Sequence, residues 1–166
     1  MISKKVCMVG AYAVGKTSLV RRLVSNIYDE QYLTTIGVKV DRTVVRVGAR
    51  AVNIVLWDMA GEDALTELRL DHLRGASGFI LVADCTRPAT VDAAISLKAR
   101  IHSRYGELPF VAALNKVDLE DRWSLTDAGG EFLKQSSLGR VQHTSALKGA
   151  GVEELFGSLA KKMIER

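Results

Sequence analysis

The sequence at residues 10–17 reads GAYAVGKT, and it lies between an apolar run at residues 6–9 and a segment of helical periodicity at residues 18–25. A glycine, four residues and then Gly-Lys-Thr is the spacing of a phosphate-binding loop that follows a strand and opens a helix. In such a loop the backbone N–H groups and the dipole of the helix bind an anion. We expect Lys16 to reach the outer phosphates and the Thr17 hydroxyl to ligate Mg²⁺.

The composition is that of an ordinary globular chain of 166 residues, 48% of them hydrophobic and 25% charged. This length predicts one domain over residues 1–166. The net charge is +4, but the Lys and Arg residues are scattered and form no basic tail, so we do not expect nucleic acid as a partner. Cys7 and Cys85 adjoin apolar runs, which predicts buried thiols in a reducing compartment.

The sequence shows no sign of membrane attachment or export. No apolar run has membrane-spanning length, the first strand leaves no room for a signal peptide, and the C-terminal residues contain no cysteine for prenylation. We therefore expect a cytoplasmic protein with no stable membrane anchor in this chain, and we expect it to be a monomer. Two explanations for the missing lipidated tail stay open: the given sequence stops before such a tail, or the protein works without membrane attachment.

Strand and helix patterns alternate along the chain, which is typical of an α/β fold with a mainly parallel sheet. A turn at Gly48 joins two strands into a hairpin, so one strand is expected to run antiparallel to the rest. In the first helix, we expect a buried face of Leu19, Val20, Leu23 and Val24. The expected strands are residues 1–10, 38–47, 52–57, 79–82, 110–114 and 141–144. The expected helices are residues 16–26, the second half of 62–74, 91–105, 125–134 and 152–164.

Asp58 and Gly61 form an Asp-x-x-Gly motif after the strand that ends at Trp57. At the end of a strand, an aspartate can hold Mg²⁺, usually through water, and a glycine N–H can approach a terminal phosphate because no Cβ blocks it. Alone, this motif is a common turn. Downstream of a phosphate loop, it predicts a second set of contacts to the phosphates.

Residues 115–118 read Asn-Lys-Val-Asp and follow the strand at residues 110–114. Guanine presents an N1–H and an exocyclic amine along one edge, and a single carboxylate can accept from both, whereas adenine offers no such pair. We expect Asp118 to be this acceptor, Asn115 to bond the base edge and the phosphate loop, and Lys116 to lay its methylenes along the base. In Ser145-Ala146-Leu147, which follows the last strand, the Ala146 N–H can approach a base oxygen. These motifs favour a guanine nucleotide and argue against a P-loop kinase or ATPase.

With these motifs in this order, the chain resembles the Ras superfamily of small GTPases over nearly its whole length. Residues 35–38 (Thr-Ile-Gly-Val), 56–58 (Leu-Trp-Asp), 74–78 and 84–86 are most similar to the Rab-type branch. The resemblance implies a three-layer P-loop G domain, with a six-stranded, mostly parallel sheet that has one antiparallel strand and is flanked by five helices. It also implies GTP/GDP and Mg²⁺ as cofactors and a switch between two nucleotide states. Its partners would be effector, exchange-factor and activating proteins that bind residues of about 27–40 and 59–75.

The resemblance further implies roles for single residues. Thr35 matches the threonine that ligates Mg²⁺ and meets the γ-phosphate, and Tyr28 matches an aromatic residue that packs against the base. The implied catalytic residues are Lys16, Thr35, Gly61 and Glu62, and the implied Mg²⁺ ligands are Thr17, Thr35 and Asp58. The implied nucleotide-binding residues are Gly10, Ala13, Val14, Gly15, Lys16, Thr17, Ser18, Tyr28, Thr35, Asp58, Gly61, Asn115, Lys116, Asp118, Ser145, Ala146 and Leu147.

Glu62, Tyr12 and Ala13 depart from the family pattern. Glu62 stands where the family usually has a glutamine that orients the attacking water. A carboxylate can accept a hydrogen bond from that water and take its proton, but it cannot donate to the γ-phosphate and is repelled by it, so the sign of its own effect does not follow from the sequence. Tyr12 and Ala13 replace residues that are often glycine or small, and we expect the Tyr12 ring to lie over the γ-phosphate, where a partner's arginine normally enters. We therefore expect slow GTP hydrolysis. The alternative is a nucleotide-locked interaction module that binds guanine nucleotide without useful hydrolysis.

Overall fold

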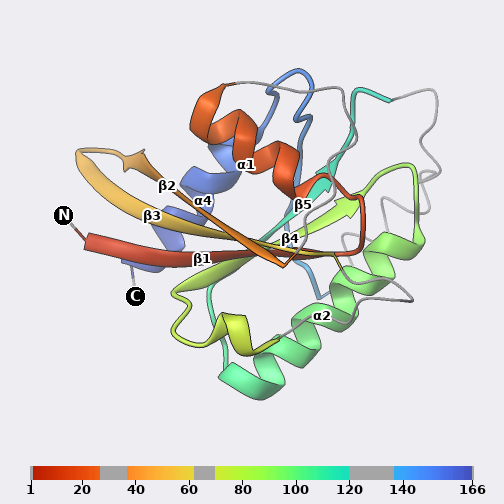
Figure 1. Ribbon diagram of the computed structural model, residues 1–166, viewed down its shortest axis with the longest axis horizontal. Helices are drawn as coiled ribbons and strands as arrows, with labels where there is room; N and C mark the ends of the chain where they lie inside the picture. The colour runs from red at the N-terminus through yellow and green to blue at the C-terminus, as the bar shows by residue number, and fades with distance from the viewer. Residues whose placement is uncertain (1, 27–36, 62–69, 120–136, 166) are drawn as a thin grey trace.

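The computed structural model of the chain describes residues 2–26, 37–61, 70–119 and 137–165 (Figure 1). Its strands are β1 (Ile2–Gly10), β2 (Val38–Val47), β3 (Arg50–Met59), β4 (Gly78–Asp84), β5 (Phe110–Asn115) and β6 (Val141–His143). Its helices are α1 (Lys16–Ser25), the 3-10 helix η1 (Leu70–Leu73), α2 (Ala89–Tyr105) and α4 (Val152–Ile164).

The six strands form one sheet in the order β2-β3-β1-β4-β5-β6. The hairpin partners β2 and β3 are antiparallel, and the other neighbouring strands are parallel. Helices α1 and α4 lie on one face of the sheet and α2 on the other, which gives three layers (Figure 1). The predicted α/β fold with a six-stranded, mostly parallel sheet and one antiparallel strand is confirmed.

Of the five flanking helices that were expected, the described residues show three α-helices, together with one 3-10 helix. The helix expected over residues 125–134 lies outside the described residues. Of the helix expected in the second half of 62–74, the described part is the single turn η1. The Arg74 N–H donates to the Asp71 carbonyl in the tight i→i+3 pattern, and Gly75 with φ of 74° follows, so this segment turns away instead of continuing as an α-helix.

Helix α1 differs from its predicted buried face at its C-terminal end. Leu19 and Val20 are buried, Leu23 is partly buried, and Val24 is exposed. The prediction for Val24 is wrong because residues 24–26, where the helix ends, are all exposed.

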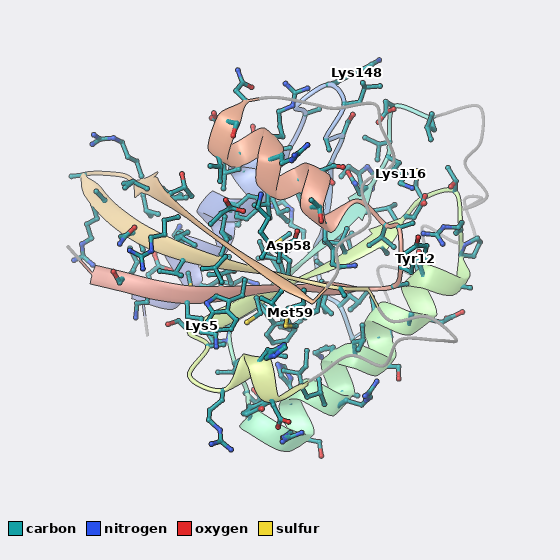
Figure 2. The ribbon with its side chains drawn as sticks, viewed as in Figure 1. Lys5, Tyr12, Asp58, Met59, Lys116 and Lys148 are labelled. Carbon is teal, nitrogen blue, oxygen red and sulfur yellow. The ribbon has the colours of Figure 1, made fainter. Side chains whose placement is uncertain are left out.

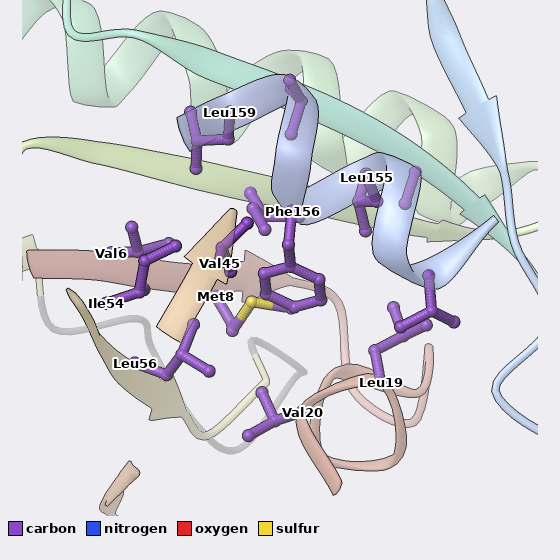
Figure 3. Packing of buried hydrophobic residues seen from close by; sticks show 14 of the residues in the cluster. Val6, Met8, Leu19, Val20, Val45, Ile54, Leu56, Leu155, Phe156 and Leu159 are labelled. Carbon is purple, nitrogen blue, oxygen red and sulfur yellow. The ribbon is translucent and has the colours of Figure 1, made fainter. Parts of the chain in front are cut away.

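In the core between the sheet and the α1–α4 layer, α4 contributes six buried residues and β3 contributes three. Phe156 of α4 lies against Met8 of β1, with side chains of β3 and α1 around them (Figure 3). Five apolar residues at helical spacing in α4 are all buried: Val152, Leu155, Phe156, Leu159 and Met163. On the other face, α2 packs on a second apolar cluster that contains the β4 residue Phe79.

Both cysteines are buried free thiols, as predicted. Burial raises the pKa of the Cys7 thiol to about 12 and, together with Asp84 and Asp118, that of the Cys85 thiol to about 11. These pKa values keep both sulfurs protonated and unreactive near neutral pH. Among the described residues, no helix is long and apolar enough to cross a membrane.

The parallel strands bring the predicted motifs to one edge of the sheet. Met8 pairs with Asp58, Gly10 with Val82 and Asp84 with Asn115, so β1, β3, β4 and β5 all end at this edge. In open α/β sheets, ligands bind beyond the carboxyl ends of the strands. The candidate site therefore lies at this edge.

Candidate functional site

The phosphate loop follows β1 and depends on its backbone. A Cβ at Gly10 would come 2.4 Å from the Val82 carbonyl oxygen. A Cβ at Gly15 would come 2.3 Å from the Asn115 side-chain nitrogen, and Gly15 has a left-handed φ of 100°. Gly15 is also the N-cap of α1, where no side chain caps the helix. The first N–H groups of α1 are thus not capped by this residue, which suits them to bind an anion.

Lys16 is buried at the start of α1 and is held by the loop itself. Its Nζ donates to the Ala11 carbonyl at 2.9 Å and to the Gly10 carbonyl at 3.2 Å. An ammonium group has three donors, so it can also bond a phosphate oxygen. Burial lowers the pKa of Lys16 to about 8, with Arg87 acting in the same direction and Asp58 against it. An anion beside this buried amine would favour its charged form.

Thr17 and Asp58 meet although they are 41 positions apart. The Thr17 hydroxyl donates to Asp58 Oδ2 at 2.5 Å, and Asp58 is buried at the end of β3. A hydroxyl and a carboxylate at a phosphate site are oxygen ligands that suit Mg²⁺. No cluster of three or more His, Cys, Asp or Glu side chains that could hold a metal occurs in the described part of the chain. The oxygens of a bound phosphate would add further hard ligands for such an ion.

Gly61 brings the chain after Asp58 against the phosphate loop. A Cβ at this position would lie 2.5 Å from the Tyr12 Cα and 2.7 Å from the Tyr12 nitrogen. Only a glycine permits such a close approach of two backbone segments. The residues present thus fit a phosphate group with Mg²⁺, because Thr17, Asp58 and Gly61 converge on the loop that holds Lys16.

Asn115 joins the base motif to the phosphate loop. Its Nδ2 donates to the Val14 carbonyl at 3.0 Å, and its Oδ1 accepts from the Thr144 hydroxyl at 3.0 Å. All of this side chain is buried except for about 1% of its surface. The bond to the phosphate loop was predicted, and the bond to Thr144 adds the segment after β6 to the same unit.

Lys116 and Asp118 are also held by partners from other segments. Lys116 Nζ donates to the Ala13 carbonyl at 2.8 Å and forms an ion pair with Asp84 Oδ2 at 2.8 Å. The Ser145 hydroxyl donates to Asp118 Oδ1 at 2.6 Å and accepts from the Lys148 N–H. The structure thus brings together the phosphate loop and the two segments for which the sequence predicts contacts to a base, 115–118 and 145–147.

Asp84 and Arg87 belong to this site, and the sequence analysis missed them. Asp84 is buried at the end of β4, and its Oδ2 accepts from Lys116 and, at 3.1 Å, from Arg87 Nε. Arg87 Nη2 donates to the Tyr12 carbonyl at 2.7 Å. One carboxylate therefore holds two cations, and each cation bonds a carbonyl of the phosphate loop. Figure 2 shows Tyr12 and Lys116 at the end of the sheet where β4 and β5 finish.

Hydrogen bonds keep Asp84 ionised in spite of its burial. Burial alone would raise the pKa of its carboxyl group, but bonds from Lys116 and from the Thr86 hydroxyl and N–H outweigh it and hold the pKa below its usual value. The signal that could have identified Asp84 is its position. It is an aspartate that ends a continuous apolar strand, at the same edge as Asp58 and Asn115.

Arg22 is the other residue that was missed. Its Nε donates to the Ala146 carbonyl at 2.8 Å, and its Nη2 donates to the Leu147 carbonyl. No local pattern identifies this role, because an arginine on an amphipathic helix is usually a solvated surface residue.

The remaining predicted residues divide between described and undescribed parts of the chain. Val14 and Ala146 are buried, Ser18 is partly buried, and Leu147 is 38% exposed. Tyr28, Thr35 and Glu62 lie outside the described residues. Tyr12 is half-buried, and the position of its ring relative to a γ-phosphate stays a prediction.

Comparison with protein families matches residues 5–165 to the Ras family. Similar proteins include the Ras-related protein Rab-21 of Bos taurus, which is 33% identical over 164 residues, 98% of this chain and 74% of the relative. The Ras-related protein Rab-32C of Dictyostelium discoideum is 30% identical and matches 99% of this chain and 75% of its own. The Ras-related protein Rab7 of Drosophila melanogaster is 32% identical and matches 97% of this chain and 80% of its own.

Proposed function

Because this chain belongs to the Ras family and has Rab-type relatives, we propose that residues 1–166 form one G domain whose described site divides into a phosphate half and a base half. The phosphate half consists of residues 10–17 and 58–61. The base half consists of residues 115–118 and 145–147. The protein is a GTP-binding switch and a GTPase, and its cofactors are GTP/GDP and Mg²⁺. The family relationship favours this switch over the nucleotide-locked module.

The two hydrogen bonds of the Asn115 side chain are the observation that most strongly supports a single nucleotide site. Its amide bonds the phosphate loop at Val14 and the segment after β6 at Thr144. These bonds fix the phosphate half relative to the base half. A ligand with a phosphate group and a purine base at the matching separation would use both halves, as a guanine nucleotide does.

In the phosphate half, Lys16 and the N–H groups of residues 13–18 bind the phosphates. The loop carbonyls hold the Lys16 ammonium in place before the ligand arrives, so little side-chain entropy is lost on binding. Thr17, Asp58 and Thr35 would hold Mg²⁺. When bound, this ion neutralises charge that builds up on the phosphate oxygens during transfer.

In the base half, Asp118 accepts from the guanine N1–H and amine. Ser145 bonds only Oδ1 of this carboxylate among the described contacts, and it fixes the orientation of the group. Lys116 is held by Asp84 and Ala13, so its methylenes form a fixed surface for one face of the base. The Ala146 N–H meets the base oxygen. Tyr28 packs against the base.

The partners of Ras and Rab family proteins are effectors, exchange factors and activating proteins. We place their contacts here at residues of about 27–40 and 59–75. Gly61 links the second of these segments to the phosphate loop, since its backbone closely approaches Tyr12. Loss of the γ-phosphate would remove contacts at Thr35 and Gly61 and release both segments. The protein acts as a monomer, and its buried free thiols suit the cytoplasm.

Slow hydrolysis is the property in which this chain is expected to differ from its relatives. Glu62 cannot donate to the γ-phosphate, and the half-buried Tyr12 stands at the loop position nearest to Gly61. Single-turnover GTP hydrolysis measures the effect directly. Glu62→Gln with Tyr12→Gly should speed it by about tenfold or more, since one transition-state hydrogen bond contributes on the order of 10² in rate. Hydrolysis that is already fast and is lost in Glu62→Ala contradicts the proposal.

The base assignment is tested with Asp118→Asn and calorimetric titration of nucleoside diphosphates. An amide accepts one hydrogen bond and donates another, so it matches xanthine, which has an oxygen where guanine has its amine. We expect the affinity for GDP to fall by about 100-fold and the affinity for xanthosine diphosphate to rise. Asp92→Asn, which removes an exposed carboxylate from α2, is the matched control and should leave both affinities unchanged. Unchanged GDP affinity in Asp118→Asn would remove Asp118 from the site.

A further inference from the structure

We propose that Arg22 positions the turn 145–148 for recognition of the 6-oxo group of guanine, an inference that rests on the base-reading role assigned above to this turn. Arg22 lies on α1, more than 120 positions from the turn in sequence. Its guanidinium group bonds two consecutive carbonyls there, at Ala146 and Leu147. The planar fork of an arginine can make two such bonds at once, and a lysine cannot.

The planarity of the peptide groups fixes the direction in which the neighbouring backbone N–H groups point. A trans peptide is planar, and its C=O and N–H groups point in opposite directions. The Ala146 carbonyl points at Arg22, so the Leu147 N–H points away from Arg22. The Leu147 carbonyl also points at Arg22, so the Lys148 N–H points away as well. Arg22 therefore sets the orientation of two successive amide donors.

The Lys148 N–H connects this turn to the carboxylate of Asp118. It donates to the Ser145 hydroxyl at 3.0 Å, and this hydroxyl donates to Asp118 Oδ1 at 2.6 Å. The Ser145 carbonyl accepts from the Gly149 N–H at 2.8 Å, which fixes the peptide that carries the Ala146 N–H. The N–H groups at Ala146 and Leu147 are thus held on the same turn as the serine that orients Asp118. Donors held in this way can meet an acceptor oxygen on the same edge of the base.

The position of Arg22 on α1 links the two halves of the site. Lys16 begins the helix, and Arg22 follows six residues later, about 9 Å along its axis. A rigid helix thus carries the phosphate-binding amine at its start and the clamp on the base-reading turn in its second turn. Arg22 Nη1 also makes two longer contacts to Asn26 at the end of α1, each 3.4 Å. These contacts anchor the guanidinium to its own helix.

Two simpler roles for Arg22 give different results in one experiment. A purely structural tie between α1 and the turn would weaken the binding of every nucleotide equally. A purely electrostatic attraction of the phosphates would be restored by any cation at position 22. A positioning role for the 6-oxo group predicts a loss that depends on the base atom and on the fork of the arginine.

The experiment measures the affinities of GDP and 6-thio-GDP for the wild type, Arg22→Met and Arg22→Lys. The thio nucleotide keeps the N1–H and amine that Asp118 reads, but it replaces the oxygen with sulfur, which is a weak acceptor. We expect Arg22→Met to weaken GDP by about tenfold and 6-thio-GDP by about twofold, because well-formed amide hydrogen bonds to oxygen are lost only for GDP. Arg22→Lys should weaken GDP by about fivefold and again affect the thio nucleotide less. Arg46→Met on the exposed face of β2 is the charge control and should change neither affinity.

Three other outcomes would contradict either the role of Arg22 or the proposed function. Equal losses for GDP and 6-thio-GDP show a structural tie only, and full restoration by Arg22→Lys shows an electrostatic effect only. If Arg22→Met does not fold, Arg22→Lys keeps the stem and the charge and carries the same comparison. Failure of the proposed function itself looks different, because the wild type would then bind ADP as well as GDP.

Discussion

The phosphate half and the base half of the site are built in different ways. In the phosphate half, glycines allow the backbone to pass within contact distance of neighbouring segments, as at Gly15 and Gly61, and a buried lysine is held by backbone carbonyls. In the base half, side chains bond other side chains, as in the pairs Asn115–Thr144 and Ser145–Asp118. The first half is therefore sensitive to added atoms, and the second is sensitive to lost donors or acceptors.

This contrast predicts how substitutions in each half change nucleotide binding. An added Cβ in the phosphate half collides with neighbouring backbone or with the Asn115 side chain, so it should strongly weaken the binding of any nucleotide. A lost hydrogen-bonding group in the base half removes one contact, so it should change which base is preferred or reduce affinity by a limited factor.

Gly15→Ala should have the largest effect because Gly15 stands between the two halves. The new Cβ would meet the Asn115 amide at 2.3 Å, and the φ of 100° is strained for any residue with a Cβ. We expect GDP affinity in a calorimetric titration to fall by on the order of 100-fold or more.

Gly106→Ala is the matched control for Gly15→Ala. Gly106 also has a left-handed φ, 76°, but a Cβ there meets no atom within 4 Å. It should lower the melting temperature modestly through backbone strain and leave GDP affinity unchanged. Equal effects of the two substitutions on affinity would show that strain, and not the clash with Asn115, determines the loss.

Asp84→Asn should have an intermediate effect, because it removes the charge that holds Lys116 and Arg87. The amide keeps the shape of the side chain but leaves both cations weakly held. We expect GDP affinity to fall by about tenfold and the free energy of unfolding to fall by about 2 kcal/mol, a value reduced for the partial exposure of both cations. Denaturant unfolding and titration of GDP measure the two effects, and Asp92→Asn serves as the control. A loss of stability without a loss of affinity would separate Asp84 from the nucleotide site.

Lys16 should make the affinity for GDP depend on pH, and this change should be smaller than that in Asp84→Asn. Burial, opposed by Asp58, gives Lys16 a pKa of about 8 in the free protein, and a bound phosphate raises that pKa because it favours the charged amine. Above pH 8 the complex then holds a proton that the free protein has partly lost, so GDP affinity falls as pH rises. Between pH 7 and 8.5 we expect a decrease of about fourfold, with proton uptake.

Calorimetry in two buffers that differ in ionisation enthalpy measures the proton uptake for Lys16. The pH range stays below the point where guanine loses its own N1 proton. Lys16→Arg keeps a permanent charge and should bind more weakly without this pH dependence. Binding at pH 8.5 without proton uptake would contradict the lowered pKa.

Ala13→Gly should have the smallest effect. Ala13 adopts a left-handed φ of 60° within the phosphate loop, a conformation that costs a residue with a Cβ about 1 kcal/mol. Glycine should raise the free energy of unfolding by up to that amount and leave GDP affinity within about twofold. Thermal unfolding measures the gain. A destabilised variant would show that the Ala13 methyl group packs usefully in the loop.

The sequence predicted the parts of the site that are contiguous. The phosphate loop, the Asp-x-x-Gly motif and residues 115–118 each place several functional groups within a few positions, so local spacing was enough to identify them. Alternating patterns also predicted all six strands and the bounds of α4. These features depend on local periodicity and backbone geometry, which a single sequence contains.

The residues that were missed depend on contacts between distant segments. Arg22 meets a turn that is more than 120 positions away, and Asp84 gathers Lys116 and Arg87 on one side chain. Neither role has a local pattern, because it arises only when parallel strands end at the same edge. The prediction that Val24 is buried is wrong for a related reason, since helical periodicity does not indicate where the end of a helix becomes exposed.

The base preference of the purified protein decides whether the two halves form one guanine-nucleotide site. Titration of GDP and ADP into the same nucleotide-free sample, with Mg²⁺, measures whether Asp118 and the turn after β6 select the purine while the phosphate half binds both ligands. We predict that GDP binds at least about 100-fold more tightly than ADP, since a site built for the guanine N1–H and amine rejects a base that lacks this pair of donors. Equal affinities for the two nucleotides would contradict it.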